Sequence, residues 1–316
     1  MTVNYDNILF PNDFETLPVD FSRFSTGLSR LELEIGFGNG EYTVRHAAAH
    51  PEMLLVGIEV SPACIARCVR RIGLLPNVKI IRTDARFMMK ELFPDESLNR
   101  VCMNFPCPWP RKRHASRRVT AGGFVDDIAA VLKIGGVFEM VTDEEWYARE
   151  VRKIFGEHEA LSAADCELLS APRPVTTKYE RKWLEMGKNI FRLNIVKEKN
   201  FTVKRRTWGF KKGESDVMHV KTGSPLPEDL PEKLSGVSGA QGEARWVFKK
   251  LFHGARAEPI HWLVETISSD AGFEQRYYLL VSARGNDVLV RPDGTSNVYL
   301  TPAVRCSIED LGRRLR

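Results

Sequence analysis

The 316-residue sequence lacks any run of about 18 apolar residues, so no membrane-spanning helix is expected. Its six cysteines include no CxxC pair, which argues against a disulfide framework and a zinc site. The first residues, MTVNYDNILFPNDF, contain Asp and Asn where a secretory leader has basic and then apolar residues. These absences predict a cytoplasmic protein without a metal, a membrane anchor or structural disulfides.

Length and charge indicate two domains. The chain is longer than one typical domain, and its net charge is +5. Residues 201–316 hold 18 Lys and Arg against 14 Asp and Glu, which leaves a nearly neutral 28 against 27 for residues 1–200. Within the neutral part, five of the eight residues at 111–118 (RKRHASRR) are basic. Such a cluster suits nucleic-acid phosphates, although a solvated loop is an equal alternative.

One stretch, LELEIGFGNG at residues 31–40, organises the first part of the chain. Apolar and acidic residues alternate as in a strand, and Gly36, Gly38 and Gly40 then allow a sharp turn and close approach of a ligand. The spacing G-x-G-x-G differs from the G-x-G-x-x-G of dinucleotide folds, and a carboxylate at Glu34 would repel a diphosphate. The turn therefore favours S-adenosylmethionine, which has a cationic tail and no phosphate; a turn that binds nothing is the alternative.

Strands alternate with helices along the next hundred residues. Strands are expected at residues 31–35, 54–60, 78–82, 98–104 and 137–141, and helices at 41–49, from Ser61-Pro62 onward, and near 123–132. This alternation predicts an α/β fold with a doubly wound, mostly parallel sheet.

Three acids follow successive strands of that sheet. Glu34, Glu59 and Asp84 are each expected at a carboxyl end, the edge where such sheets bind ligands. A carboxylate after the second strand can accept both hydrogen bonds of a ribose diol, and one after the third can reach an adenine amine. Each acid alone could instead cap a helix, but their matching positions favour an adenosylmethionine pocket.

The order and spacing of several motifs resemble the bacterial tRNA (guanine-N7-)-methyltransferases. They are LEIGFGNG, GIEV, Asp84-Ala85, NFPCPWPRKRH, Val141-Thr142-Asp143 and Thr177-Lys178-Tyr179-Glu180, and they cover residues 30 to 197. The resemblance implies an S-adenosylmethionine-dependent methyltransferase domain at residues 30–200 that methylates N7 of the variable-loop guanine at position 46 of tRNA. It implies that the cofactor site includes Glu34, Gly36, Gly38, Gly40, Glu59, Asp84, Ala85 and Cys107. It implies that the guanine and tRNA side includes Arg111, Asp143, Thr177, Lys178, Tyr179 and Glu180.

Position 107 departs from the family pattern. The family motif is F-P-D-P-W, and its aspartate is assigned to cofactor binding and catalysis, whereas this chain has Cys107. A thiol cannot accept a bidentate hydrogen bond. Guanine N7 already carries a free lone pair, so the substitution is expected to weaken methyl transfer without abolishing it. Cys107 could equally do no more than pack in its loop.

Two other functions stay open at this point. One is a tRNA-binding protein that kept the fold and lost catalysis at Cys107. The other is a small-molecule methyltransferase, against which the basic residues 111–118 argue. Salt-insensitive activity without RNA would support the small-molecule methyltransferase, because phosphate contacts make RNA binding fall steeply with salt.

The remaining segments are less informative. Residues 1–29 are expected to form an arm, and residues 201–212 (FTVKRRTWGFKK) either an RNA-contacting segment or an edge strand. Residues 222–244 are rich in Pro, Gly and Ser, as in a linker. Strand-like runs at 245–252, 260–267, 276–282, 288–290 and 297–300, with a helix near 308–315, predict a small α+β domain over residues 245–316 that grips tRNA.

Overall fold

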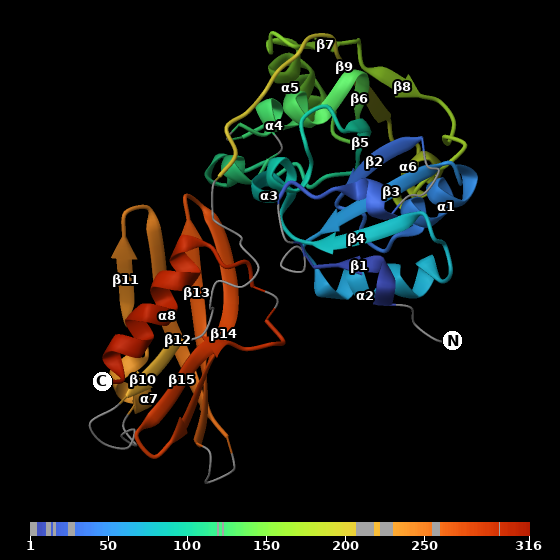
Figure 1. Ribbon diagram of the computed structural model, residues 1–316. Coiled ribbons are helices and arrows are strands. Elements are labelled where there is room, and N and C mark those ends of the chain that lie inside the picture. The colour runs from blue at the N-terminus through green and yellow to red at the C-terminus, as the bar shows by residue number, and fades with distance from the viewer. Residues whose placement is uncertain are drawn as a thin grey trace. The chain divides into compact units, whose positions relative to one another are not determined.

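The computed structural model describes two compact units (Figure 1). It describes residues 5–10, 14, 17–24, 29–118, 120–121, 123–206, 218–221, 230–254, 260–296 and 298–316. The first unit contains the described residues up to 10 and from 17 to 206, and the second contains residue 14 and those from 218 onward.

The first unit is a nine-stranded sheet with helices on both faces (Figure 1). Its strands are β1 (Ile8–Leu9), β2 (Arg30–Ile35), β3 (Met53–Glu59), β4 (Val78–Arg82), β5 (Leu98–Asn104), β6 (Leu132–Thr142), β7 (Leu161–Ala163), β8 (Glu167–Leu169) and β9 (Ile190–Lys197). Its α-helices are α1 (Glu41–Ala49), α2 (Pro62–Ile72), α3 (Ala85–Leu92), α4 (Phe124–Val131), α5 (Glu145–Gly156) and α6 (Lys178–Glu185). Among the described residues, the short 3-10 helices are η1 (Tyr5–Asn7), η3 (Phe21–Phe24) and η4 (Lys112–Arg117).

The strand order is β1-β4-β3-β2-β5-β6-β9-β7, with β8 also paired to β9. Strands β1 to β6 pair in parallel, and β9 joins the sheet antiparallel to β6. The order reverses next to β2, between β3 and β5, which is the switch point where open α/β sheets bind ligands. The predicted mostly parallel α/β sheet is confirmed.

Local sequence explains these elements. Strand β3 is an unbroken apolar run, and all its residues before Glu59 are buried because helices cover both faces of the sheet. Helix α2 begins where Ser61 accepts a hydrogen bond from the Cys64 N–H and Pro62 takes the first helical position. The cysteines do not pair, since all six are free thiols.

Residues expected to form only an arm extend the sheet. Ile8 and Leu9 pair in parallel with Ile80 and Ile81 as β1. Farther along, Phe21 is buried and stacks on Phe93 with ring centroids 4.8 Å apart. The N-terminal segment thus covers one edge of the sheet, which limits unwanted edge pairing.

The basic segment after β9 anchors to α3 over its described part, residues 201–206, which form no edge strand. Arg205 donates to the carbonyls of Lys90 and Phe93 and pairs with Asp95 at 2.6 Å. The Arg206 N–H donates to both oxygens of Glu91. These two arginines therefore have structural partners, while residues 207–212 lie outside the described part.

The second unit is a six-stranded antiparallel sheet in the order β10-β15-β14-β13-β12-β11. Its elements are β10 (Met218–Lys221), α7 (Leu230–Leu234), β11 (Ser238–Gln241), β12 (Ala244–His253), β13 (Ile260–Asp270), β14 (Phe273–Arg284), β15 (Asp287–Pro292) and α8 (Pro302–Arg314). Strand β14 alternates buried and more exposed residues, and its buried set joins residues of α7 and α8 in one apolar core. Helices therefore cover one face of this sheet.

Two expectations for this region differ from the structure. Within the expected linker, residues 230–234 form α7 and residues 238–241 form β11; residues 222–229 lie outside the described part. The strand expected at 297–300 is wrong for its described residues, 298–300, which have no regular structure. Gln275 explains this: its side chain binds the N–H and the carbonyl of Tyr299, so the segment bonds to a side chain instead of a strand.

Candidate active site

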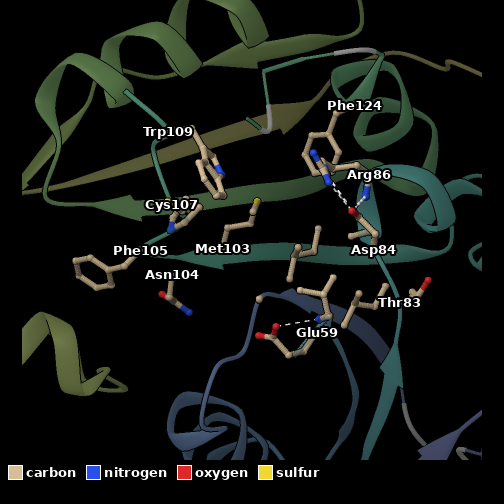
Figure 2. Close-up of a pocket in the computed structure, with 16 residues that line it drawn as sticks. Glu59, Thr83, Asp84, Arg86, Met103, Asn104, Phe105, Cys107, Trp109 and Phe124 are labelled. Carbon is tan, nitrogen blue, oxygen red and sulfur yellow. Dashed lines mark hydrogen bonds and ion pairs between the residues drawn. The ribbon is translucent and has the colours of Figure 1, made fainter. Parts of the chain in front are cut away.

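A pocket of about 380 Å³ lies at the carboxyl ends of β2, β3, β4 and β5. Its lining includes Gly36 after β2, Glu59 at the end of β3, Asp84 after β4, and Asn104 at the end of β5 (Figure 2). Its size and its few polar groups suit a small-molecule ligand.

Glu59 is held by backbone donors on both carboxylate oxygens. Its Oε1 accepts from the N–H groups of Val60 at 2.9 Å and Ser61 at 3.0 Å, and its Oε2 accepts from Gly38 at 3.1 Å. These bonds fix the side chain at the pocket. A carboxylate held in this way can accept hydrogen bonds from hydroxyl groups of a ligand.

The glycines of the turn have different reasons to lack a side chain. All three have positive φ, from 56° to 74°. A Cβ on Gly36 or Gly38 meets nothing within 4 Å, so these positions leave open space for a ligand. A Cβ on Gly40 would lie 2.8 Å from the Cβ of Cys68, so Gly40 is required by the packing of α1 against α2. This packing role separates Gly40 from the other two.

Asp84 caps α3 and also binds an arginine. Its carboxylate accepts from the Arg86 N–H at 3.0 Å and forms an ion pair with the Arg86 guanidinium at 2.5 Å (Figure 2). Asp84, Ala85 and Arg86 all line the pocket. Asp84 therefore lies at the pocket, and Arg86, which sequence reasoning missed, binds its carboxylate.

Glu34 does not line the pocket but lies buried beside it. It accepts from the Thr43 hydroxyl at 2.7 Å and from the Asn104 amide at 3.4 Å. Burial raises the pKa of Glu34 to about 7, although these two hydrogen bonds and the nearby Arg100 and Arg173 oppose the rise. Asn104 lines the pocket, so its hydrogen bond connects Glu34 to the pocket.

The loop after β5 has an unusual backbone. Phe105 and Trp109 have positive φ values of 53° and 45°, a conformation that costs non-glycine residues free energy and that clusters at functional sites. The guanidinium of Arg118 donates to the Trp109 carbonyl at 3.0 and 3.2 Å and so stabilises this turn. Cys107, between the two strained residues, is exposed and lines the pocket, so it is not a packing residue (Figure 2).

The basic residues 111–118 divide into two groups. Arg118 is partly buried and pairs with Glu150 at 3.0 Å, so its role is structural. Arg111 and Arg113 are exposed. Nucleic-acid contact by this cluster would therefore fall to residues such as Arg111 and Arg113.

The segment Thr177 to Glu180 begins α6. The Thr177 hydroxyl accepts from the Glu180 N–H at 3.0 Å, which caps the helix, and Glu180 is fully buried. Lys178 is exposed, and Tyr179 is 58% exposed with its ring 6.3 Å from that of Phe105. Thr177 and Glu180 thus stabilise the start of the helix, whereas Lys178 and Tyr179 face outward, with Tyr179 next to the loop after β5.

Asp143, also expected on the substrate side, lies just after β6. Its carboxylate pairs with Lys188 at 2.9 Å, and the Lys188 ammonium lies 3.7 Å from the centroid of the Trp183 ring. This contact links the end of β6 to the segment after α6.

Arg173 joins three of the predicted motifs, and sequence reasoning missed it. Its guanidinium donates to Glu180 at 2.7 Å, to Glu139 at 2.7 Å and to the Asn104 side-chain oxygen at 2.7 Å. Asn104 in turn donates to Glu34. A single buried side chain therefore positions the start of α6, the end of β5 and the carboxylate of β2. In the sequence, Arg173 is a single arginine between two prolines in a loop, and no periodic pattern there marks it as a buried residue.

The same face of the sheet holds a larger buried ionic network. Arg100 pairs with Glu32 at 3.1 Å and with Glu139 at 2.8 Å, and Arg192 pairs with Glu139 at 2.6 Å. Burial alone would raise the pKa of Glu139, but Arg100 and Arg173 outweigh it and lower the pKa to about 2. Glu139 therefore stays ionised at any physiological pH and keeps its arginines in place.

These groups can bind and orient a ligand, but they show no metal site. Among the described residues, no cluster of three or more His, Cys, Asp or Glu side chains could hold a metal ion. No helix in the described ranges is long and apolar enough to cross a membrane.

Comparison with known proteins gives consistent results. The family model described as "Putative methyltransferase" matches residues 29–193. A tRNA (guanine-N(7)-)-methyltransferase from Thermotoga maritima is 39% identical over 97% of this chain and 96% of its own. One from Saccharophagus degradans is 37% identical over 51% of this chain and 72% of its own. A solved 16S rRNA (adenine(1408)-N(1))-methyltransferase from Catenulisporales acidiphilia covers 57% of this chain and 92% of its own, with 16% identity and a TM-score of 0.43.

Proposed function

The chain belongs to the tRNA (guanine-N(7)-)-methyltransferase family, and we propose that it transfers the methyl group of S-adenosylmethionine to N7 of a guanine in tRNA. The observation that carries the proposal is the 39% identity over nearly the whole length of both chains. A tRNA substrate is consistent with activity in the cytoplasm.

The pocket residues fit the cofactor. Glu59, fixed by three backbone N–H groups, would accept the ribose hydroxyls, and Asp84 would accept the adenine amine beside the Ala85 backbone. Gly36 and Gly38 leave the space that a side chain would take. Glu34 would attract the cationic amino-acid end of the cofactor. Asn104, which donates to Glu34 and lines the pocket, would lie between the two.

S-adenosylmethionine, when bound, supplies an electrophilic methyl group on a sulfonium. The protein's task is then alignment, because guanine N7 has a lone pair and needs no general base. Holding two reacting groups in line can itself lower the barrier by several kcal/mol. We assign the guanine to the side of Phe105, which lines the pocket, and of the exposed Tyr179, whose rings lie 6.3 Å apart and offer a stacking surface, and we assign tRNA phosphates to Arg111. Cys107 would contact the ligands weakly in place of a carboxylate.

Methyl transfer from labelled S-adenosylmethionine to unmodified tRNA, followed by nucleoside analysis, tests this function. The expected product is 7-methylguanosine. We further propose the variable-loop guanine at position 46 as the target, so a transcript with adenine at that position should accept no label. Tight binding of both ligands without any methylated product would contradict the proposal and favour a binding protein that has lost its chemistry.

A further inference from the structure

The sheet of the second unit has one face that α7 and α8 do not cover. Direct partners across antiparallel strands share a face, so the register identifies the residues of this outer face. Phe252 of β12 lies opposite Leu263 of β13, and Leu263 lies opposite Leu280 of β14. None of these three belongs to the buried core set of the unit, whereas their neighbours Val264, Leu279 and Val281 do.

Two aromatic rings lie next to each other on the outer face. Phe252 is 47% exposed and Tyr278 is 36% exposed, and their ring centroids are 6.1 Å apart in an edge-to-face arrangement. Tyr278 is two residues from Leu280 on β14 and so projects on the same side. Large apolar side chains this exposed on a sheet carry a cost in water, and they are typical of binding surfaces.

Several basic side chains lie on the same outer face. The register places Arg245 opposite Ser269, Arg276 opposite Ile267 and Arg291 opposite Leu280, all on the outer face. Lys249 and Lys250 are exposed where the pairing of β12 with β13 shifts register. The acids on this face are fewer: Glu265, which lies opposite Tyr278 and is paired with Arg276, Asp287, which is paired with Lys221, and Glu274 near the β13–β14 turn. Asp293, whose N–H donates to the Tyr278 carbonyl, adds a fourth acid next to the aromatic pair. The face is therefore complementary to a polyanion.

We propose that this outer face binds unpaired nucleotides of the tRNA substrate, with Phe252 and Tyr278 stacking on bases and its arginines and lysines contacting phosphates. Open antiparallel sheets that carry aromatic residues use this mode to bind single-stranded RNA. The inference rests on the proposed function, because it takes tRNA as the substrate. A protein partner is disfavoured, since lysines are depleted at protein interfaces and Lys249 and Lys250 are exposed close to Phe252 in the sequence.

The second unit then contributes affinity and not chemistry. The Saccharophagus degradans relative, which carries the same activity in its name, matches only 51% of this chain. The reaction residues proposed above all lie within residues 29–206, in the first unit. Loss of the outer face should accordingly raise the KM for tRNA and leave the KM for S-adenosylmethionine unchanged.

The test compares full-length variants in tRNA binding and in steady-state methylation. The double variant Phe252→Ala/Tyr278→Ala should raise the Kd for tRNA by about 10-fold or more, because each base stacked on an aromatic ring contributes substantially. The matched variant Phe252→Tyr/Tyr278→Phe keeps both rings and should retain wild-type affinity. Lys249→Ala/Lys250→Ala should weaken binding and reduce its salt dependence, by about one unit of slope per lost phosphate contact.

Controls and contrary outcomes are distinct. Leu74→Ala in the first unit, at an 89% exposed side chain, and Arg313→Ala on α8 should change nothing. Unchanged tRNA affinity in the double alanine variant, with wild-type 7-methylguanosine formation, would overturn this inference and leave the proposed function intact. The double alanine variant could instead have a lower molecular mass than the wild type in size-exclusion chromatography with light scattering, at unchanged tRNA affinity. That result would identify the face as an interface between copies of this chain and would also overturn the inference. A wild-type protein that methylates no tRNA would contradict the proposed function itself.

Discussion

Replacing Arg173 by Met should destabilise the first unit and also weaken cofactor binding. The Arg173 side chain is 8% exposed, and the change leaves Glu180, which is fully buried, without its guanidinium. Removing one partner of a buried ion pair typically costs about 3–5 kcal/mol. Glu139 keeps Arg100 and Arg192, and the backbone N–H of residue 173 still donates to Glu180, so we expect the lower end, about 3 kcal/mol.

A double-mutant cycle separates the ion pair from general damage. Calorimetric unfolding of Arg173→Met, Glu180→Gln and the double variant should give a double variant that is less destabilised than the sum of the two, by about 1–3 kcal/mol. The reason is that Glu180→Gln removes the buried charge that Arg173→Met leaves unpaired. Additive effects within about 0.5 kcal/mol would refute the coupling.

Kinetics then test whether Arg173 positions the pocket. Without Arg173, the side-chain oxygen of Asn104 loses its donor, so Asn104 can turn away from Glu34. The KM for S-adenosylmethionine should rise by about 10-fold, since small misplacements at such sites are costly. Arg192→Met is the matched control, because it also removes an arginine from Glu139 but does not touch Asn104. An equal rise in KM for both variants would show that Arg173 has only a structural role.

Three further changes test the pocket. Because the folded pKa of Glu34, about 7, exceeds its ordinary 4.5, folding takes up a proton between these values, and Glu34 costs stability as pH rises from 4.5 to 7. The unfolding free energy of Glu34→Gln relative to wild type should therefore rise with pH across this window; a flat difference would contradict the shift. Gly36→Ala and Gly40→Ala both carry the strain of a positive φ, but only Gly40→Ala also collides with Cys68, so it should destabilise by about 1–3 kcal/mol more than Gly36→Ala. Gly36→Ala should also raise the KM for S-adenosylmethionine; unfolding and kinetics on both variants check this, and equal destabilisation would contradict it. Cys107→Asp should raise kcat/KM by up to about 10-fold at unchanged stability, the effect of one added hydrogen bond to a charged group, and the same activity in Cys107→Ala would show that the residue at 107 has no catalytic role.

Much of the first unit follows from local sequence. The expected helix at 41–49 and the expected strands at 78–82 and 98–104 have the observed bounds, because apolar runs bounded by turn residues specify buried parallel strands. Glu59 and Asp84 line the pocket as expected, since the carboxyl ends of neighbouring parallel strands meet at one edge.

The buried side of β2 could not be predicted in this way. Glu32 and Glu34 alternate with leucines in the sequence, and both acids are only 1% exposed. Their partners come from distant segments: Arg100 lies 68 residues from Glu32, and Asn104 lies 70 residues from Glu34. A periodic pattern shows which face is polar, but it does not show whether a charged partner will cover that face.

The substitution at position 107 becomes understandable from this arrangement. Glu59, which lines the pocket, is fixed by backbone N–H groups, and the buried Glu34 beside the pocket is held through Asn104 and Arg173. Cys107 is exposed in the loop above them and supports none of these contacts within the described residues. Position 107 can therefore change from a carboxylate to a thiol without moving the rest of the pocket. For a reaction that depends on alignment and needs no base, such a change should lower the rate and leave the reaction itself intact.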